Sequence, residues 1–114
     1  MNAITFDTVR DLARDLAGIE ESTTYGWPAL KLKGKLVAWM PVRKEVEPNT
    51  LAVRMDVEQR DPLIEEAPNT YYLTNHYLNY PAVLVRLSQI DRESLRDILR
   101  SSWRYVSSES RKRP

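Results

Sequence analysis

Residues 25–40 read YGWPALKLKGKLVAWM, and this stretch decides the fold. A glycine and a proline near its start mark a turn between two strands, since both residues favour turn conformations. From Ala29 to Leu32 apolar residues alternate with lysine, which is the period of a half-buried strand. Lys33-Gly34 suits a tight hairpin turn, and Leu36 to Met40 forms an apolar return strand. The stretch therefore predicts antiparallel strands in direct succession.

The residues on either side of this stretch predict a helix before it and a strand after it. Residues 6–17 carry apolar side chains at helical spacing, with Thr5 as a favourable N-cap and Gly18 as a C-cap. From Ile19 the helical period is lost, and the chain leads into the first turn as a strand. A polar loop follows the return strand, and residues 50–55 read as a fourth strand. Together these strands predict an antiparallel meander.

The second half of the chain predicts a short helix and two further strands. The acidic segment 56–66 is compatible with a helix, but Pro62 fits best in the first turn, with Asp61 as the cap. A helix placed in this way is short or broken. Residues 71–74 and 82–87 are rich in β-branched and aromatic side chains and read as strands.

A final amphipathic helix completes the order α, four strands, α, two strands, α. Asp91 caps it, and its buried stripe is predicted to consist of Leu95, Ile98, Leu99, Trp103 and Val106. This order predicts an α+β fold, a two-layer sandwich in which an antiparallel sheet carries its helices on one face. We expect a single domain over residues 1–108 and a flexible basic tail over 109–114.

Composition limits the function further. The chain has 114 residues and no cysteine, which excludes disulfides and thiol nucleophiles. Its formal net charge of +1 implies no obligatory charged partner. No apolar run is long enough to span a membrane, and the N-terminus lacks the basic and apolar regions of a signal peptide. We expect a cytoplasmic protein with no membrane partner.

Three groups of motifs, in this order along the chain, resemble the MmcQ/YjbR-like family. The first comprises GIEE at 18–21, YGWPA at 25–29 and Gly34-Lys35; the second is HYLNYPAVLVRL at 76–87; the third is Ser102-Trp103. The resemblance covers nearly the whole chain except the basic tail. It implies an α+β fold similar to that of secretion chaperones. It also implies a DNA-binding role, drawn from a double-wing arrangement of β-hairpins, and no enzyme chemistry.

Basic residues on and near the predicted hairpin are the candidates for nucleic-acid binding, because lysine and arginine side chains neutralise phosphates. They are Lys31, Lys33, Lys35, Arg43, Lys44 and Arg54. We predict a non-enzymatic module that binds DNA weakly, without sequence preference and with strong sensitivity to salt. The same alternation is also typical of a sheet with one solvated face, and lysines protect edge strands from pairing with other chains. Both interpretations remain open at this stage.

The aromatic segment between the last two strands is the second candidate region. Its candidate residues are His76, Tyr77, Asn79 and Tyr80. The alternative function is a protein-interaction or chaperone-like module in which this loop or the sheet holds a partner segment, including a second copy of the chain. A third possibility is a cleft for a small ligand or substrate lined by Tyr25, Trp27, His76 and Tyr77. A single histidine with no partner, and no recognisable metal or cofactor motif, predicts no catalytic residues, metal or cofactor.

Overall fold

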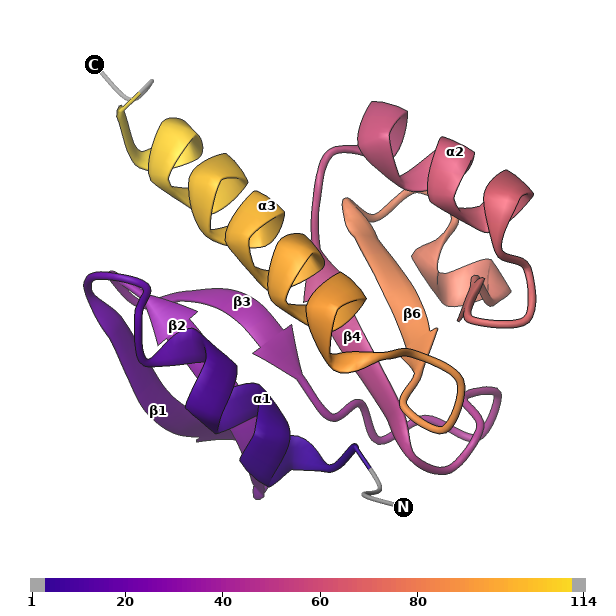
Figure 1. Ribbon diagram of the computed structural model, residues 1–114, viewed down its shortest axis with the longest axis horizontal. Coiled ribbons are helices and arrows are strands. Elements are labelled where there is room, and N and C mark those ends of the chain that lie inside the picture. Colours follow the sequence, from indigo (N-terminus) through magenta and orange to yellow (C-terminus); the bar gives the residue numbers. More distant parts are fainter. Residues whose placement is uncertain (1–3, 112–114) are drawn as a thin grey trace.

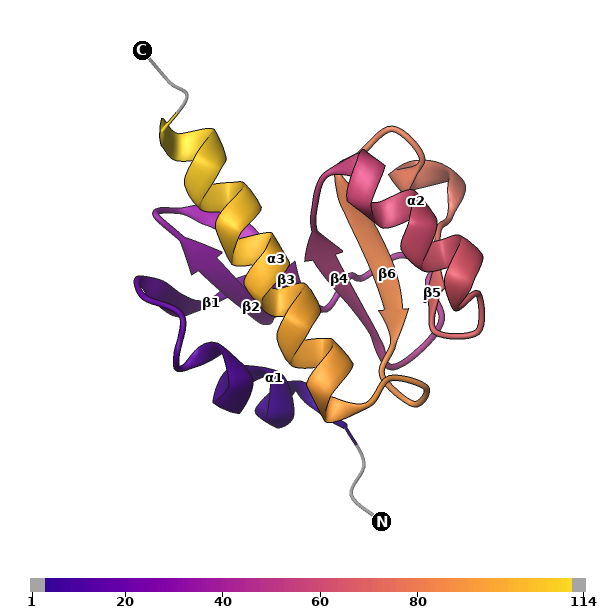
Figure 2. The same ribbon diagram turned by 45° about the horizontal axis from the view of Figure 1, so that its top comes forward.

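The computed structural model describes residues 4–111 and confirms the predicted α+β order (Figure 1). The elements are α1 (Phe6–Ala13), β1 (Ile19–Thr24), β2 (Trp27–Leu32), β3 (Lys35–Trp39), β4 (Thr50–Arg54), α2 (Val57–Glu66), β5 (Tyr71–Tyr72), the 3-10 turn η1 (Asn75–Tyr77), β6 (Ala82–Arg86) and α3 (Arg92–Arg111). All strand pairs are antiparallel, and the six-stranded sheet has the order β1-β2-β3-β4-β6-β5. Figure 2 shows α1 and α3 lying across the same face of the sheet.

Two tight turns set the first three strands. The β1–β2 turn has Tyr25 at φ 51° and Gly26 at φ 79°, and the β2–β3 turn has Lys33 at φ 52° and Gly34 at φ 80°. Positive φ at both central residues is the conformation whose twist matches that of paired antiparallel strands. The predicted turn at Lys33-Gly34 is thus confirmed, and the chain forms two consecutive hairpins that share β2.

A bulge in β3 follows the second turn. Leu30 of β2 pairs with Ala38 and its neighbour Lys31 pairs with Leu36, so Val37 is an extra residue in β3. The Ser102 hydroxyl of α3 donates a hydrogen bond to the Val37 carbonyl over 3.1 Å, and Ser102 is fully buried. This bond joins α3 to the irregular position of the sheet.

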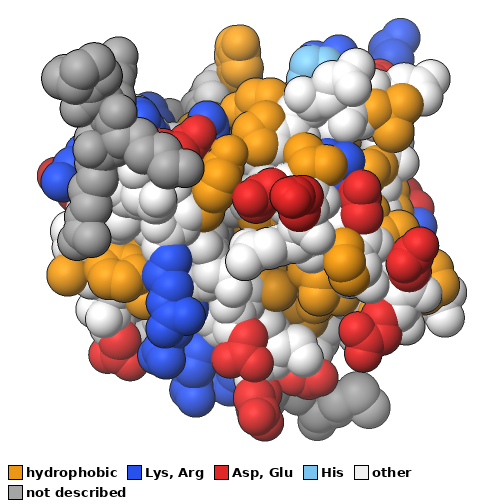
Figure 3. All heavy atoms as spheres, turned by 90° about the horizontal axis from the view of Figure 1, so that it is seen from above, with side chains coloured by type: hydrophobic (Ala, Val, Ile, Leu, Met, Phe, Trp, Pro, Cys, Tyr) orange, Lys and Arg blue, Asp and Glu red, His pale blue; other side chains and the backbone are white. Residues whose placement is uncertain are grey.

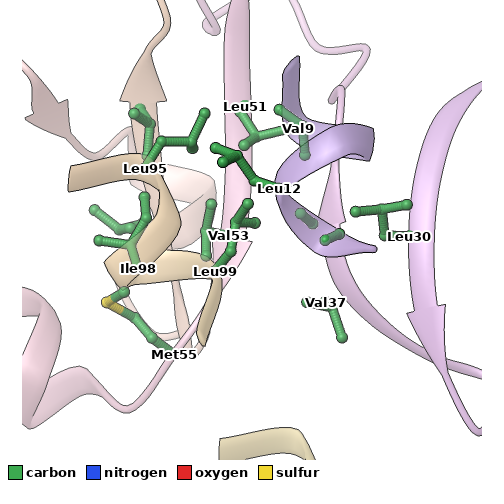
Figure 4. Close-up of a cluster of buried hydrophobic side chains, with 14 of the residues drawn as sticks. Val9, Leu12, Leu30, Val37, Leu51, Val53, Met55, Leu95, Ile98 and Leu99 are labelled. Carbon is green, nitrogen blue, oxygen red and sulfur yellow. The ribbon is translucent and has the colours of Figure 1, made fainter. Parts of the chain in front are cut away.

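The main core lies between the sheet and the helices. Figure 4 shows side chains from α1, α3 and the central strands directed toward one another, among them Val9, Leu30, Leu51 and Leu95. A smaller cluster covers the other face, where Tyr77 of η1 packs with neighbouring strand residues. Because both faces of the central strands are covered, β4 and β6 read as nearly continuous apolar runs instead of alternating.

Two predicted helix boundaries were wrong. The first helix ends at Ala13 and not at residue 17, because the chain leaves the helix through a turn that still buries Leu16 and reaches positive φ at Gly18. The second helix begins at Val57, where the Asp56 carboxylate accepts a hydrogen bond from the Glu58 N–H over 3.0 Å.

Pro62 therefore lies inside α2, not in its first turn. Its exposed ring removes one backbone hydrogen bond without ending the helix. β5 covers only Tyr71–Tyr72 and is thus shorter than the predicted strand over 71–74; η1 follows at Asn75.

The last helix begins as predicted and extends further than expected. The Asp91 carboxylate accepts a hydrogen bond from the Ser94 N–H over 2.7 Å, as an N-cap does. Trp103 is only partly buried, and its indole N–H donates to the Ala17 carbonyl over 2.8 Å. α3 continues to Arg111, three residues into the segment expected as a tail, while 112–114 lie outside the described residues.

Candidate functional site

A groove of about 470 Å³ opens on the sheet face opposite the helices. It lies where the β1–β2 turn, the chain that leaves β3 and the loop containing η1 come together. Its lining consists of Thr24, Tyr25, Leu36, Trp39, Met40, Pro41, Val42, Arg43, His76, Tyr77 and Tyr80. A hollow of this size falls within the roughly 300–1,000 Å³ typical of ligand sites.

Aromatic rings packed edge to face form the floor and one wall of the groove. The Trp39 and Tyr80 rings meet edge to face with centroids 6.1 Å apart, and Tyr77 and Tyr80 do so at 5.9 Å. His76 lies against Tyr77 in the same manner at 4.7 Å. Burial raises the pKa of the Tyr77 phenol, so its hydroxyl stays protonated at neutral pH. Trp39 is buried in the floor of the groove.

Arg60 of α2 holds the loop that carries this wall. The residue is 3% exposed, and its guanidinium donates to the backbone carbonyls of Tyr77 (3.2 Å), Tyr80 (2.9 Å), Ala82 (3.4 Å) and Leu78 (3.3 Å). Its Nε also donates to the Asp61 carboxylate over 3.0 Å. One buried cation thus satisfies the carbonyls of a loop that has little regular structure of its own.

Tyr25 forms the opposite rim and is unusual in two respects. Its side chain is 92% exposed, and its backbone has the positive φ that asparagine, aspartate or glycine normally supplies at this turn position. Trp27 is 50% exposed and pairs with Thr24 of β1, which lines the groove. Trp27 itself is not part of the lining. Two exposed aromatic side chains therefore stand together at one end of the sheet.

The candidate basic residues lie in separate groups along β3 and beyond it. Lys33 and Lys35 border the β2–β3 turn, whereas Arg43 and Lys44 follow the other end of β3. At about 3.3 Å per residue, β3 alone separates the two groups by about 13 Å. Arg54 forms an ion pair with Glu109 of α3 at 3.4 Å.

Lys31 is the hairpin lysine that lies next to the groove. It lies directly across from Leu36, which lines the groove, and on its other side from Glu20 of β1. Figure 3 shows a face on which Lys and Arg side chains form a narrow band, with acidic side chains beside it.

The structure brings most of the predicted loop candidates to the groove. His76, Tyr77 and Tyr80 line it, together with Tyr25 from the proposed cleft, while Asn79 is exposed and outside the lining. Over residues 4–111, the His76 imidazole makes no hydrogen bond, and no cluster of three or more His, Asp or Glu side chains is arranged to hold a metal ion. Among the rings that line the groove, Tyr25 and His76 are exposed, whereas Trp39 and Tyr77 are buried.

The family model described as YjbR matches residues 14–105. The chain belongs to the YjbR family. Two curated relatives, the uncharacterized proteins Mb2600 of Mycobacterium bovis and Rv2570 of Mycobacterium tuberculosis, are each 31% identical over 113 residues, which cover 87% of this chain and 85% of theirs. The crystal structure of Deinococcus radiodurans protein DR2400, of the DUF419 domain family, matches with a TM-score of 0.77 at 21% identity, covering 95% of this chain and 82% of that one.

The motifs that resemble the YjbR family have identifiable places in this structure. Ser102 and Trp103 bond to the bulge in β3 and to the turn after α1, so this pair positions α3 on the sheet. The YGWPA motif supplies the exposed turn at the rim of the groove. Among the described residues, no helix is long and apolar enough to cross a membrane.

Sequence reasoning missed Arg60 altogether. It lies in a strongly acidic segment, where a lone arginine reads as a solvated partner of its neighbours. Its partners are backbone carbonyls about twenty residues away. Because every residue has a backbone carbonyl, the sequence does not indicate which ones a side chain will bind.

Proposed function

We propose that this YjbR protein is a non-enzymatic nucleic-acid-binding module that contacts phosphate groups through the β2–β3 hairpin. The observation that supports the proposal is the position of Lys31, Lys33 and Lys35 and their lack of ion-pair partners among the described residues. They surround a tight turn, and within the described part of the chain none of them forms an ion pair. Their ammonium groups are available to phosphates without first breaking a protein contact.

The same geometry implies weak binding without sequence preference. Lysine acts as a mobile point charge and reads no base, so contacts of this kind position a duplex without selecting its sequence. Three phosphate contacts predict a slope of about −2.7 for the logarithm of the binding constant against the logarithm of the salt concentration. A net charge of +1 adds little long-range attraction.

The test compares two variants that carry the same change in charge. Lys31→Glu, Lys33→Glu and Lys35→Glu reverse the hairpin, and Arg92→Glu, Arg96→Glu and Arg100→Glu reverse three exposed side chains of α3. A labelled duplex is titrated with each protein at low salt after circular dichroism confirms the fold. We expect loss of binding in the hairpin variant and retained binding in the α3 variant. Equal loss in both would contradict a role for the hairpin itself.

A second candidate function, a protein-interaction module, is favoured by the apolar surface around the groove. Tyr25, Trp27 and Val42 are all exposed there, and β1 is an edge strand of six residues. Such a surface is suited to a partner segment or a second copy of the chain. Sedimentation velocity over a range of protein concentrations tests self-association: a dimer that Trp27→Thr abolishes supports it, and a monomer throughout contradicts it.

A further inference from the structure

We infer that the groove holds an unpaired base of single-stranded nucleic acid, with phosphates on either side contacted by Lys31 and Arg43. This inference rests on the proposed nucleic-acid binding and names the form of nucleic acid that the protein prefers. It adds the stacking of a base to the charge contacts of the hairpin.

The chemistry of the groove fits a flat, sequence-independent ligand. Among the rings that line it, those of Tyr25 and His76 are exposed and that of Tyr80 is partly exposed, while Trp39 and Tyr77 are buried beneath them. Every base presents a π-face, so stacking on such rings does not require a particular sequence. A base within a duplex is already stacked on its neighbours and does not enter a groove without being extruded.

The strained turn at Tyr25 is a second, independent observation. Its positive φ costs roughly 1–3 kcal/mol for a residue other than glycine. Its ring is 92% exposed, so packing of the ring adds almost no stability to offset this cost. Asparagine followed by glycine would form the same turn without this cost. An exposed ring kept at a strained position on the rim of an aromatic groove indicates a ring that contacts a ligand.

Cations at both ends of the groove fit a phosphate backbone. Lys31 is the cross-strand neighbour of the lining residue Leu36, and Arg43 lines the other end. The ion pair of Arg43 with Glu45 at 3.6 Å is exposed on both sides and yields readily to a phosphate. Glu20 of β1 pairs with Lys31, and its negative charge opposes the binding of a phosphate there.

Fluorescence anisotropy with two labelled probes tests the inference. They are oligothymidylate of about 12 nucleotides, within the range of single-strand site sizes, and a duplex of the same length. The proteins are the wild type, Tyr25→Asn and Lys33→Asn. The two variants make the same change at the equivalent position of the two turns, and asparagine is compatible with both.

We expect the wild type to bind the single strand more tightly than the duplex. Tyr25→Asn should weaken single-strand binding about tenfold, as loss of one stacking contact does, and leave duplex binding unchanged. Lys33→Asn should reduce the salt slope for both probes while the preference for the single strand persists.

The outcomes separate this inference from the proposed function. Equal affinity for the two probes together with a neutral Tyr25→Asn would overturn the inference and leave the hairpin mechanism standing. Single-strand binding that depends on Tyr25 and is indifferent to Lys33 would support the groove and count against the hairpin. No binding of either probe at low salt would overturn both.

Discussion

Replacing Arg60 with methionine should destabilise the protein by about 3 kcal/mol and open the loop that forms the groove wall. Methionine keeps much of the apolar stem of arginine but provides no donors. The guanidinium donates to four carbonyls, and the bonds to Tyr77 and Ala82 are buried whereas those to Tyr80 and Leu78 are only partly buried.

The magnitude follows from the two buried carbonyls. An unsatisfied buried acceptor costs roughly 1–3 kcal/mol, while the partly buried carbonyls can accept water at little cost. The Ala82 contact is long, at 3.4 Å, which places its contribution at the lower end. A loss of about 3 kcal/mol is a large share of the 5–15 kcal/mol by which domains are usually stable.

Urea denaturation followed by far-UV circular dichroism measures this loss, and near-UV circular dichroism reports the packing of the Tyr77 and Trp39 rings. The matched control is Arg100→Met on the exposed face of α3, for which we expect a change within about 0.5 kcal/mol. An Arg60→Met protein that loses less than about 1 kcal/mol and keeps its near-UV spectrum would refute the view that this side chain holds the loop.

Three further predictions follow from individual contacts. Ser102→Ala removes the donor to the Val37 carbonyl and should lower the free energy of unfolding by about 1–3 kcal/mol in urea denaturation, an effect that Ser102→Thr should not reproduce in full. Tyr25→Asn relieves backbone strain and should raise thermal stability by about 1 kcal/mol in scanning calorimetry; a decrease would show that the exposed ring supports the fold. The hydrogen bond from the Ser94 N–H lowers the pKa of Asp91 below 3.8, so this carboxylate stabilises the fold above about that pH, and the stability is lost as pH falls through the lowered value. Asp91→Asn should therefore lose stability less steeply between about pH 5 and pH 2, which acid titration of the unfolding midpoint measures.

Local signals carried the fold prediction. A few adjacent residues determine each of the features that gave the element order: the turn at Lys33-Gly34, the Asp91 cap and the apolar runs of β4 and β6. The order could therefore be predicted correctly. The same reliance on local signals failed at Pro62, because Asp56 caps α2 so that it begins at Val57, and the helix continues through the proline.

The candidate site was less accessible to sequence reasoning. Its aromatic residues were identified from the sequence. The groove itself forms only where the β1–β2 turn, the end of β3 and the η1 loop come together, and this arrangement depends on strand pairing between residues far apart in the sequence. The lysine alternation was equally compatible with a solvated sheet face. Only the cross-strand register shows that Lys31 lies beside Leu36 of the groove, whereas Lys35 pairs with Leu32 next to the β2–β3 turn.

The salt dependence of duplex binding tests the central proposal most directly. Binding constants of the wild type and of the Lys31→Glu, Lys33→Glu, Lys35→Glu variant are measured at several salt concentrations from low to moderate. We predict a slope of about −2.7 for the wild type and no measurable binding for the variant at any of them. A wild type that fails to bind at low salt, or a variant that binds with the wild-type slope, would contradict phosphate recognition by this hairpin.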